Sequence, residues 1–143
     1  MHTRNLVRLI TFLLTVLFFY TALSKLMDID TFHNQLANQN LPRWTVPYLV
    51  WLIPACELVA VGFLISGRFR SLGLYMSSLM MLVFTLYIGL IVIGFFDRVP
   101  CSCGGVLKSM SFGSHLVFNV FFLCIAILAA KLNDALSLPV DRA

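Results

Sequence analysis

Four long apolar segments, separated by shorter polar stretches, dominate the pattern of hydrophobic and polar positions along the chain. They lie at about residues 6–25, 46–66, 71–96 and 110–131. An α-helix of about 20 apolar residues crosses the hydrocarbon core of a bilayer, so each segment is long enough to span a membrane. The pattern therefore predicts an all-α fold, an integral membrane four-helix bundle that forms a single domain over residues 1–143.

The first apolar segment follows Arg4 and Arg8 and so resembles a secretory signal with a basic start. No clear small-x-small cleavage site follows it, and we expect it to be retained as the first helix. Because its apolar run is short for a full span, Arg8 and Lys25 are expected to extend their charged ends toward opposite interfaces.

The connection at residues 26–45 is polar, but its spaced apolar residues predict a short amphipathic helix that ends before Pro42 and lies on the membrane surface. These apolar residues are Phe32, Leu36 and Leu41. Aromatic residues typical of a membrane–water interface follow at Trp44, Tyr48 and Trp51. The second apolar segment is interrupted by Pro54 and Glu57.

Composition supports a membrane protein, because 60% of the 143 residues are hydrophobic and only 11% are charged. The formal net charge is +4. The ten basic residues are scattered at the ends of the apolar segments and form no patch with interleaved aromatic residues, so nucleic acid is not an expected partner. We expect the protein to be surrounded by membrane lipid.

The distribution of Lys and Arg predicts the orientation of the bundle. Six basic residues flank one side: Arg4, Arg8, Arg68, Arg70, Lys131 and Arg142. Four flank the other: Lys25, Arg43, Arg98 and Lys108. We therefore expect both termini in the cytoplasm and the loop at residues 97–111 outside, in a multi-pass protein of a bacterial cytoplasmic (inner) membrane, where an oxidising outer face suits cysteine chemistry.

Cys101 and Cys103 are the strongest candidates for catalysis, since the loop reads Cys-Ser-Cys-Gly-Gly after Pro100. A turn at these residues could bring the two thiols within disulfide range. A disulfide that closes so small a ring is strained, and strained, exposed disulfides exchange readily with a partner's thiols. Arg98 and Lys108 would favour the thiolate form, and Cys103 is the weaker candidate for the attacking thiol.

Two other interpretations of this loop stay open. It could be a structural tie in a noncatalytic accessory or scaffold subunit, although a bridge over so few residues adds little stability. It could also hold a soft metal with His115 or His33, but the missing fourth ligand argues against zinc, and no metal site is predicted.

Four polar residues inside or beside the apolar segments are candidate supporting residues: Lys25, Glu57, His115 and Asn119. Glu57 lies near the middle of its segment, so it should face the bundle interior and be protonated or paired, with Lys25 as one candidate partner. His115 and Asn119 share one helix face just after the cysteine loop. Proton transfer, orientation of the loop and ordinary interhelical packing all remain alternatives for these residues.

Cys56 and Cys124 lie inside apolar segments, where a free cysteine behaves as a small apolar residue. A second internal pair between them is left open but not expected, because no nearby positive charge would activate a thiolate.

The sequence resembles the MauE branch of the DoxX-like membrane proteins over nearly its whole length. The resemblance rests on Tyr20-Thr21-Ala22-Leu23-Ser24-Lys25, on Pro54-Ala55-Cys56-Glu57 with Gly62, and on Cys101-Ser102-Cys103-Gly104-Gly105 followed by His115 and Asn119. It implies a bundle similar to the vitamin K epoxide reductase type and a role in thiol–disulfide handling for exported proteins. In the namesake family that role is associated with maturation of methylamine dehydrogenase, but nothing in this sequence points to methylamine.

The resulting hypothesis is a membrane redox protein whose Cys101 and Cys103 exchange electrons with a periplasmic thioredoxin-like or exported protein. The chain has no second Cys-x-x-Cys motif of the kind that marks complete epoxide-reductase-like enzymes. A quinone cofactor is therefore left open and is supported by no motif.

Overall fold

The structure is a computed structural model that describes residues 2–96 and 111–137. Within these ranges the chain is helical and contains no strand. The elements are α1 (His2–Met27), α2 (Ile29–Ala37), a short 3-10 helix η1 (Arg43–Thr45), α3 (Val46–Ile65), α4 (Arg70–Val92) and α5 (Phe112–Ser137).

Four helical stretches are long and apolar enough to cross a membrane: 2–27, 43–65, 70–92 and 113–137. Their lengths of 23 to 26 residues exceed the roughly 20 residues that a bilayer requires. The prediction of an all-α membrane bundle with four spans is therefore confirmed. Many of their large apolar side chains are exposed on the outside of the bundle, where lipid is the surrounding that suits them.

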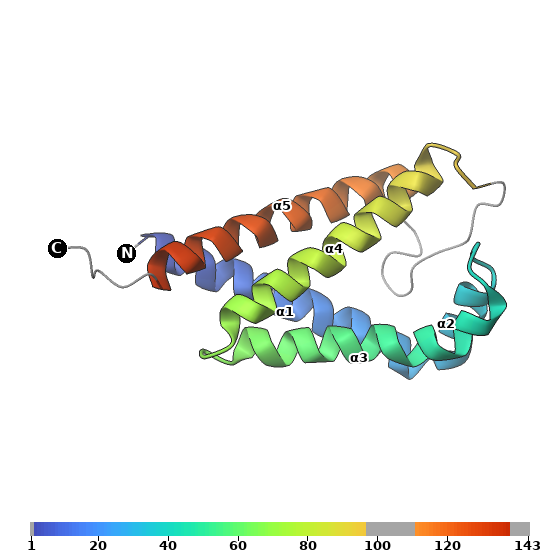
Figure 1. The fold of residues 1–143 in the computed structure, drawn as a ribbon, viewed down its shortest axis with the longest axis horizontal. Coiled ribbons are helices and arrows are strands. Elements are labelled where there is room, and N and C mark those ends of the chain that lie inside the picture. The colour runs from blue at the N-terminus through green and yellow to red at the C-terminus, as the bar shows by residue number, and fades with distance from the viewer. Residues whose placement is uncertain (1, 97–110, 138–143) are drawn as a thin grey trace.

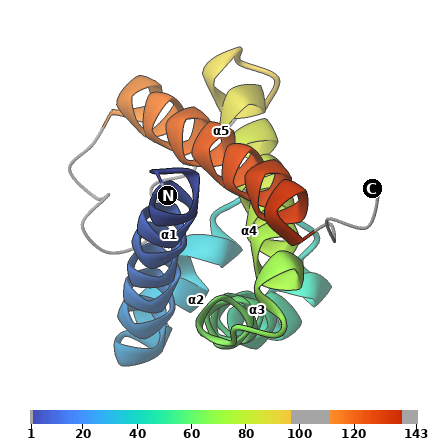
Figure 2. The same ribbon diagram turned by 90° about the vertical axis from the view of Figure 1, so that its left-hand side faces the viewer.

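The four long helices form a closed ring in the order α1, α3, α4 and α5, since each packs against the next and α5 packs against α1. Figure 2 shows this ring viewed along the bundle. The beginning of α1, the end of α5 and the turn between α3 and α4 lie at one end of the bundle (Figure 1). The end of α4, the beginning of α5 and α2 lie at the opposite end, which we call the α2 end.

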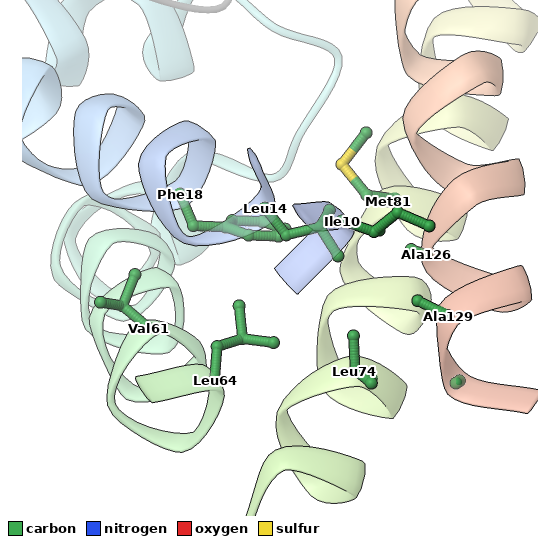
Figure 3. Close-up of a cluster of buried hydrophobic side chains, with 10 residues drawn as sticks. Ile10, Leu14, Phe18, Val61, Leu64, Leu74, Met81, Ala126 and Ala129 are labelled. Carbon is green, nitrogen blue, oxygen red and sulfur yellow. The ribbon is translucent and has the colours of Figure 1, made fainter. Parts of the chain in front are cut away.

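The main core fills the middle of the ring. It contains Ile10, Leu14 and Phe18 from α1, Val61 and Leu64 from α3, Leu74 and Met81 from α4, and Ala126, Ala129 and Ala130 from α5. Figure 3 shows these side chains gathered between the helices, with Ala126 and Ala129 at the α5 side of the cluster. Small residues on α5 allow its backbone to approach its neighbours closely, as is common between helices in membranes.

Several threonine hydroxyls inside the spans are satisfied by the helix that carries them. Thr11 Oγ1 donates to the Val7 carbonyl at 2.7 Å, and Thr85 Oγ1 donates to the Met81 carbonyl at 2.6 Å. Because lipid offers no hydrogen bonds, this bonding to the carbonyl four residues earlier lets threonine occupy an apolar helix.

The short helix predicted in the connection is present as α2. Asp28 caps its beginning by accepting a hydrogen bond from the Thr31 N–H at 3.2 Å. Phe32 and Leu36 are buried against Val46 and Val50, so the apolar face of α2 packs on the first turns of α3. Its location on the membrane surface stays a prediction.

Three helix limits differ from the sequence-based expectation. α1 begins at His2, well before residue 6. α4 ends at Val92 instead of 96, because Gly94 adopts a φ of 74° and its N–H donates to the Ile91 carbonyl, an arrangement that terminates helices. α5 continues past 131 to Ser137. α3 runs without a break through Pro54, which interrupts the apolar segment in the sequence.

Candidate functional site

The polar centre of the bundle is an ion pair between Lys25 and Glu57. Lys25 lies in the last turn of α1, and Glu57 lies in the middle of α3. Lys25 Nζ is 2.7 Å from Glu57 Oε1, and the two side chains are only 11% and 2% exposed. Lys25 Nζ also donates to the Thr21 carbonyl at 3.4 Å. Glu57 therefore faces the bundle interior as predicted, and of the two alternatives left open for it, protonation or pairing, the structure shows a pair with Lys25, the candidate partner.

The second carboxylate oxygen of Glu57 is buried and has no hydrogen-bond partner among the described residues. The Thr21 hydroxyl lies near this carboxylate, but it donates to the Phe18 carbonyl at 3.2 Å. A buried carboxylate oxygen without a donor is costly in an apolar surrounding. Glu57 Oε2 is therefore an acceptor that is ready to bind a donor.

A cavity of about 210 Å³ adjoins the ion pair. All five α-helices contribute to its walls, which are mostly apolar. The polar residues that line it are Thr21, Lys25, Gln35, Gln39, Glu57, Tyr87, His115 and Asn119. The structure thus brings the four predicted supporting residues to one cavity, while the function of these residues stays a prediction.

His115 and Asn119 enter the cavity from the first turns of α5. Both are buried, with 7% and 5% of their surfaces exposed. The Ser111 hydroxyl accepts a hydrogen bond from the Ser114 N–H at 3.3 Å, and the His115 N–H donates to the Ser111 carbonyl at 2.9 Å. Ser111 therefore caps the helix that carries the two residues and fixes the turn from which His115 projects.

Cys101 and Cys103 lie outside the described residues. The segment that contains them, 97–110, follows Phe96 and precedes Ser111, and the end of α4 and the beginning of α5 that flank it lie at the α2 end of the bundle. His115 lies in the first turn of α5, so the cavity is at that same end.

The two other cysteines are both free. Cys56 is half-buried on α3, and Cys124 is exposed on α5, so the structure contains no second pair between them. Within 2–96 and 111–137, no group of three His, Cys, Asp or Glu residues could hold a metal ion. His33 is exposed on α2, whereas His115 is buried in the cavity.

Sequence reasoning missed the two glutamines of the cavity. Gln35 follows Phe32 by three residues and so continues the buried side of α2, whereas Gln39 lies just after α2 ends at Ala37. Helical spacing from Phe32 was the signal that could have identified Gln35. No such signal marks Gln39.

A second polar cluster, also missed, joins α4 to α5 at the end opposite the cavity. Asp134 accepts hydrogen bonds from the Ser71 hydroxyl at 3.0 Å and from the Tyr75 hydroxyl. The Asn133 amide donates to the Ser71 hydroxyl at 2.7 Å. We call these four residues the α4–α5 clasp, and its position far from the cavity indicates a structural role.

In a comparison with known families, the family model described as methylamine utilisation protein MauE matches residues 3–132. This range contains all five α-helices except the first residue of α1 and residues 133–137 of α5. A search of curated proteins and a search of solved structures each find no match.

Proposed function

The chain belongs to the methylamine utilisation protein MauE family, and from this premise we propose that it exchanges thiol–disulfide equivalents through Cys101 and Cys103 in support of the maturation of exported proteins. A partner's thiolate attacks one sulfur of the Cys101–Cys103 disulfide and forms a mixed disulfide. The partner's second thiolate then attacks its own bound sulfur, which leaves the partner oxidised and Cys101 and Cys103 as a dithiol. Two electrons and two protons pass from the partner to this chain.

One observation carries the proposal. The segment that contains both cysteines connects to the bundle at the end where Lys25, Glu57, His115 and Asn119 line one cavity. Buried ionisable groups inside a membrane are costly, so their collection at this end favours a functional role over simple packing. Arg98 and Lys108, within the same segment, would stabilise a thiolate.

The supporting residues have a positioning role in this proposal. The Lys25–Glu57 pair joins α1 to α3, and His115 and Asn119 lie on the first turns of α5, directly after the cysteine segment. Because the cysteine segment directly precedes α5, a movement of α5 relative to the Lys25–Glu57 pair would also move the cysteine segment. His115 is also the residue best suited to carry a proton during exchange.

The orientation that suits this chemistry has both termini in the cytoplasm and the α2 end at the oxidising outer face of a bacterial inner membrane. Five described basic residues lie toward the other end: Arg4, Arg8, Arg68, Arg70 and Lys131. The described basic residues at the α2 end are Lys25 and Arg43. Glu57 neutralises Lys25, so of these two only Arg43 adds a net positive charge there. This asymmetry supports the orientation.

The partner in this proposal is a periplasmic thioredoxin-like protein or an exported protein that acquires disulfides. The description of the family supports a role in methylamine utilisation. Under that role, the recipient of the disulfides is a protein that the cell exports when it grows on methylamine.

The test is replacement of Cys101 and Cys103 by serine, singly and together, with Cys56→Ser and Cys124→Ser as matched controls. Exchange requires that the first set abolish growth on methylamine or disulfide formation in the exported partner, while the controls keep it. A variant that keeps one reactive cysteine should attack the disulfide of the oxidised partner, the reverse of the last step, and should form a mixed disulfide that its missing second thiol cannot resolve, visible on a nonreducing gel when oxidised partner is added. Partial function in the double variant, with normal folding, would contradict exchange and favour a scaffold.

A further inference from the structure

The cavity beside the ion pair has the size of a compact ring system. Its volume is about 210 Å³, and an apolar protein cavity of about 150 Å³ is large enough to bind benzene. Its walls include the aromatic side chains of Phe18, Phe32, Phe84, Tyr87 and Phe118. Aromatic walls favour a planar ring, because ring pairs gain energy beyond the burial of area alone.

The polar residues of the cavity determine which substituent a bound ring compound should carry. A lysine ammonium has three N–H donors, and Lys25 uses two of them, on Glu57 Oε1 and on the Thr21 carbonyl. One donor remains. Glu57 is 1% exposed, and its Oε2 is an acceptor without a donor among the described residues. The same ion pair therefore offers one donor and one acceptor side by side.

A hydroxyl group satisfies both, since it donates to Glu57 Oε2 and accepts from Lys25. A carbonyl or ether oxygen could accept from Lys25 but would leave Glu57 Oε2 without a donor and place two acceptors together. The ligand should also be neutral, because the pair has no net charge and the surroundings are apolar. Val83 lines the cavity and is 55% exposed on α4, so a substituent on the ring could extend into the lipid.

We propose that this cavity binds a neutral, membrane-soluble ring compound with a free hydroxyl group, a phenol or hydroquinone, whose hydroxyl bridges Lys25 and Glu57. The inference does not depend on the cysteines. It concerns binding alone and names no reaction of the ligand.

Three probes of similar size separate the contributions: 1-naphthol, 1-methoxynaphthalene and naphthalene. The first has a hydroxyl group, the second has an oxygen that only accepts, and the third has no polar atom. Binding is measured by equilibrium dialysis of the protein in lipid nanodiscs against empty nanodiscs. We expect 1-naphthol to bind roughly tenfold or more tightly than either of the other two, as a hydrogen bond to a charged group would produce. Equal binding of the three, or no saturable binding of 1-naphthol, would overturn the proposal.

Two variants test the location. Lys25→Met combined with Glu57→Leu replaces the buried pair by apolar residues, a change that proteins often tolerate. It should remove the preference for 1-naphthol and leave naphthalene binding in place, whereas a preference that persists would contradict a bridging hydroxyl. Val83→Trp puts a much larger side chain at this exposed lining position and should weaken the binding of all three probes. Its control is Val59→Trp, since Val59 is similarly exposed, at 47%, and does not line the cavity.

Two further comparisons complete the design. The Cys101→Ser, Cys103→Ser chain should bind 1-naphthol as the native chain does, so a failure of thiol exchange and a failure of ligand binding are distinguishable. A phenol with a long alkyl tail, compared with a short water-soluble one, identifies the source of the ligand. The tailed phenol partitions more strongly into empty nanodiscs, and its binding is corrected for that partition. If the corrected binding is tighter than that of the short phenol, the ligand is a membrane lipid. If the two bind equally, the ligand is a small solute.

Discussion

At the scale of single residues, Glu57 determines the character of the bundle interior. A carboxylate in the middle of a membrane helix is costly unless it is paired, and Lys25 supplies the partner at 2.7 Å. The pair links α1 to α3, it leaves Lys25 and Glu57 each with one further hydrogen-bonding position, and both residues line the cavity.

Removing one member of the pair should destabilise the protein far more than removing both. Glu57→Leu leaves a buried ammonium, and Lys25→Met leaves a buried carboxylate, and each should cost about 3–5 kcal/mol. The double variant leaves no buried charge and should recover most of that loss. Unfolding by sodium dodecyl sulfate in mixed micelles, followed by circular dichroism, measures all three. A double variant whose loss equals the sum of the single losses would show that the pair is not coupled.

The sequence was sufficient to predict that Glu57 faces the bundle interior, because an ionisable residue in a membrane helix is costly on the side that faces lipid. It predicted the partner only as one candidate, since nothing local to Glu57 selects Lys25, which is distant in sequence. The convergence of His115 and Asn119 on the same cavity requires the helix arrangement, which apolar periodicity does not encode. Gln35 was missed because its polarity concealed its helical register with Phe32, and Gln39 because it lies after the end of α2.

At the scale of helices, Gly73 allows a close approach between α3 and α4. A Cβ atom at this position would lie 2.7 Å from the Leu64 backbone nitrogen and 2.9 Å from the Phe63 carbonyl carbon. Neither backbone atom can move alone, so any side chain here must push the two helices apart. Small residues at such contacts are a recurring feature of membrane bundles.

Gly73→Ala should therefore lower the free energy of unfolding by roughly 1–3 kcal/mol, the usual cost of overpacking. Gly89→Ala is the matched control, because Gly89 lies on the same helix and a Cβ there meets nothing within 4 Å. The control should change stability by less than about 0.5 kcal/mol. Equal effects of the two substitutions would mean that the α3–α4 contact is not close in the folded protein.

The α4–α5 clasp explains why α5 extends beyond the predicted limit. Lys131 marks the end of the apolar run, but Asn133 and Asp134 find partners on α4 and continue the helix. A hydropathy pattern predicts where a span leaves the lipid and carries no information on such contacts. The same pattern could not locate the end of α4, which depends on the backbone conformation of Gly94.

Asp134→Ala removes the acceptor that binds Ser71 and Tyr75, and should lower stability by about 1 kcal/mol, a typical value for polar contacts between membrane helices. Asp134→Asn keeps an acceptor oxygen and should lose less. Thermal unfolding in detergent compares the two. If Asp134→Ala is as stable as the native protein, the clasp contributes nothing to the packing of α4 on α5.

At the scale of the whole molecule, the ring of four spans places the beginning of α1 and the end of α5 at one end and the cavity at the other. The excess of basic residues at the first end predicts that it faces the cytoplasm. This orientation decides whether the cysteine segment meets an oxidising or a reducing compartment, so it is a condition for the proposed exchange.

Labelling of single cysteines tests the orientation in a chain whose four native cysteines are replaced by serine. Asn40→Cys places a thiol at the exposed α2 end, and Thr3→Cys places one at the exposed start of α1. A thiol reagent that does not cross membranes should label position 40 in intact cells, and position 3 only after the cells are permeabilised. The reverse pattern would place the cysteine segment in the cytoplasm.

The most direct test of thiol–disulfide exchange is a redox titration of Cys101 and Cys103 in the purified chain carrying Cys56→Ser and Cys124→Ser. Alkylation across graded thiol–disulfide buffers, read by mass, counts the free thiols at each potential. The account predicts a reversible two-electron couple at roughly −120 to −270 mV, the range of known exchange proteins. A pair that stays reduced in every buffer, or stays oxidised in every buffer, would contradict exchange.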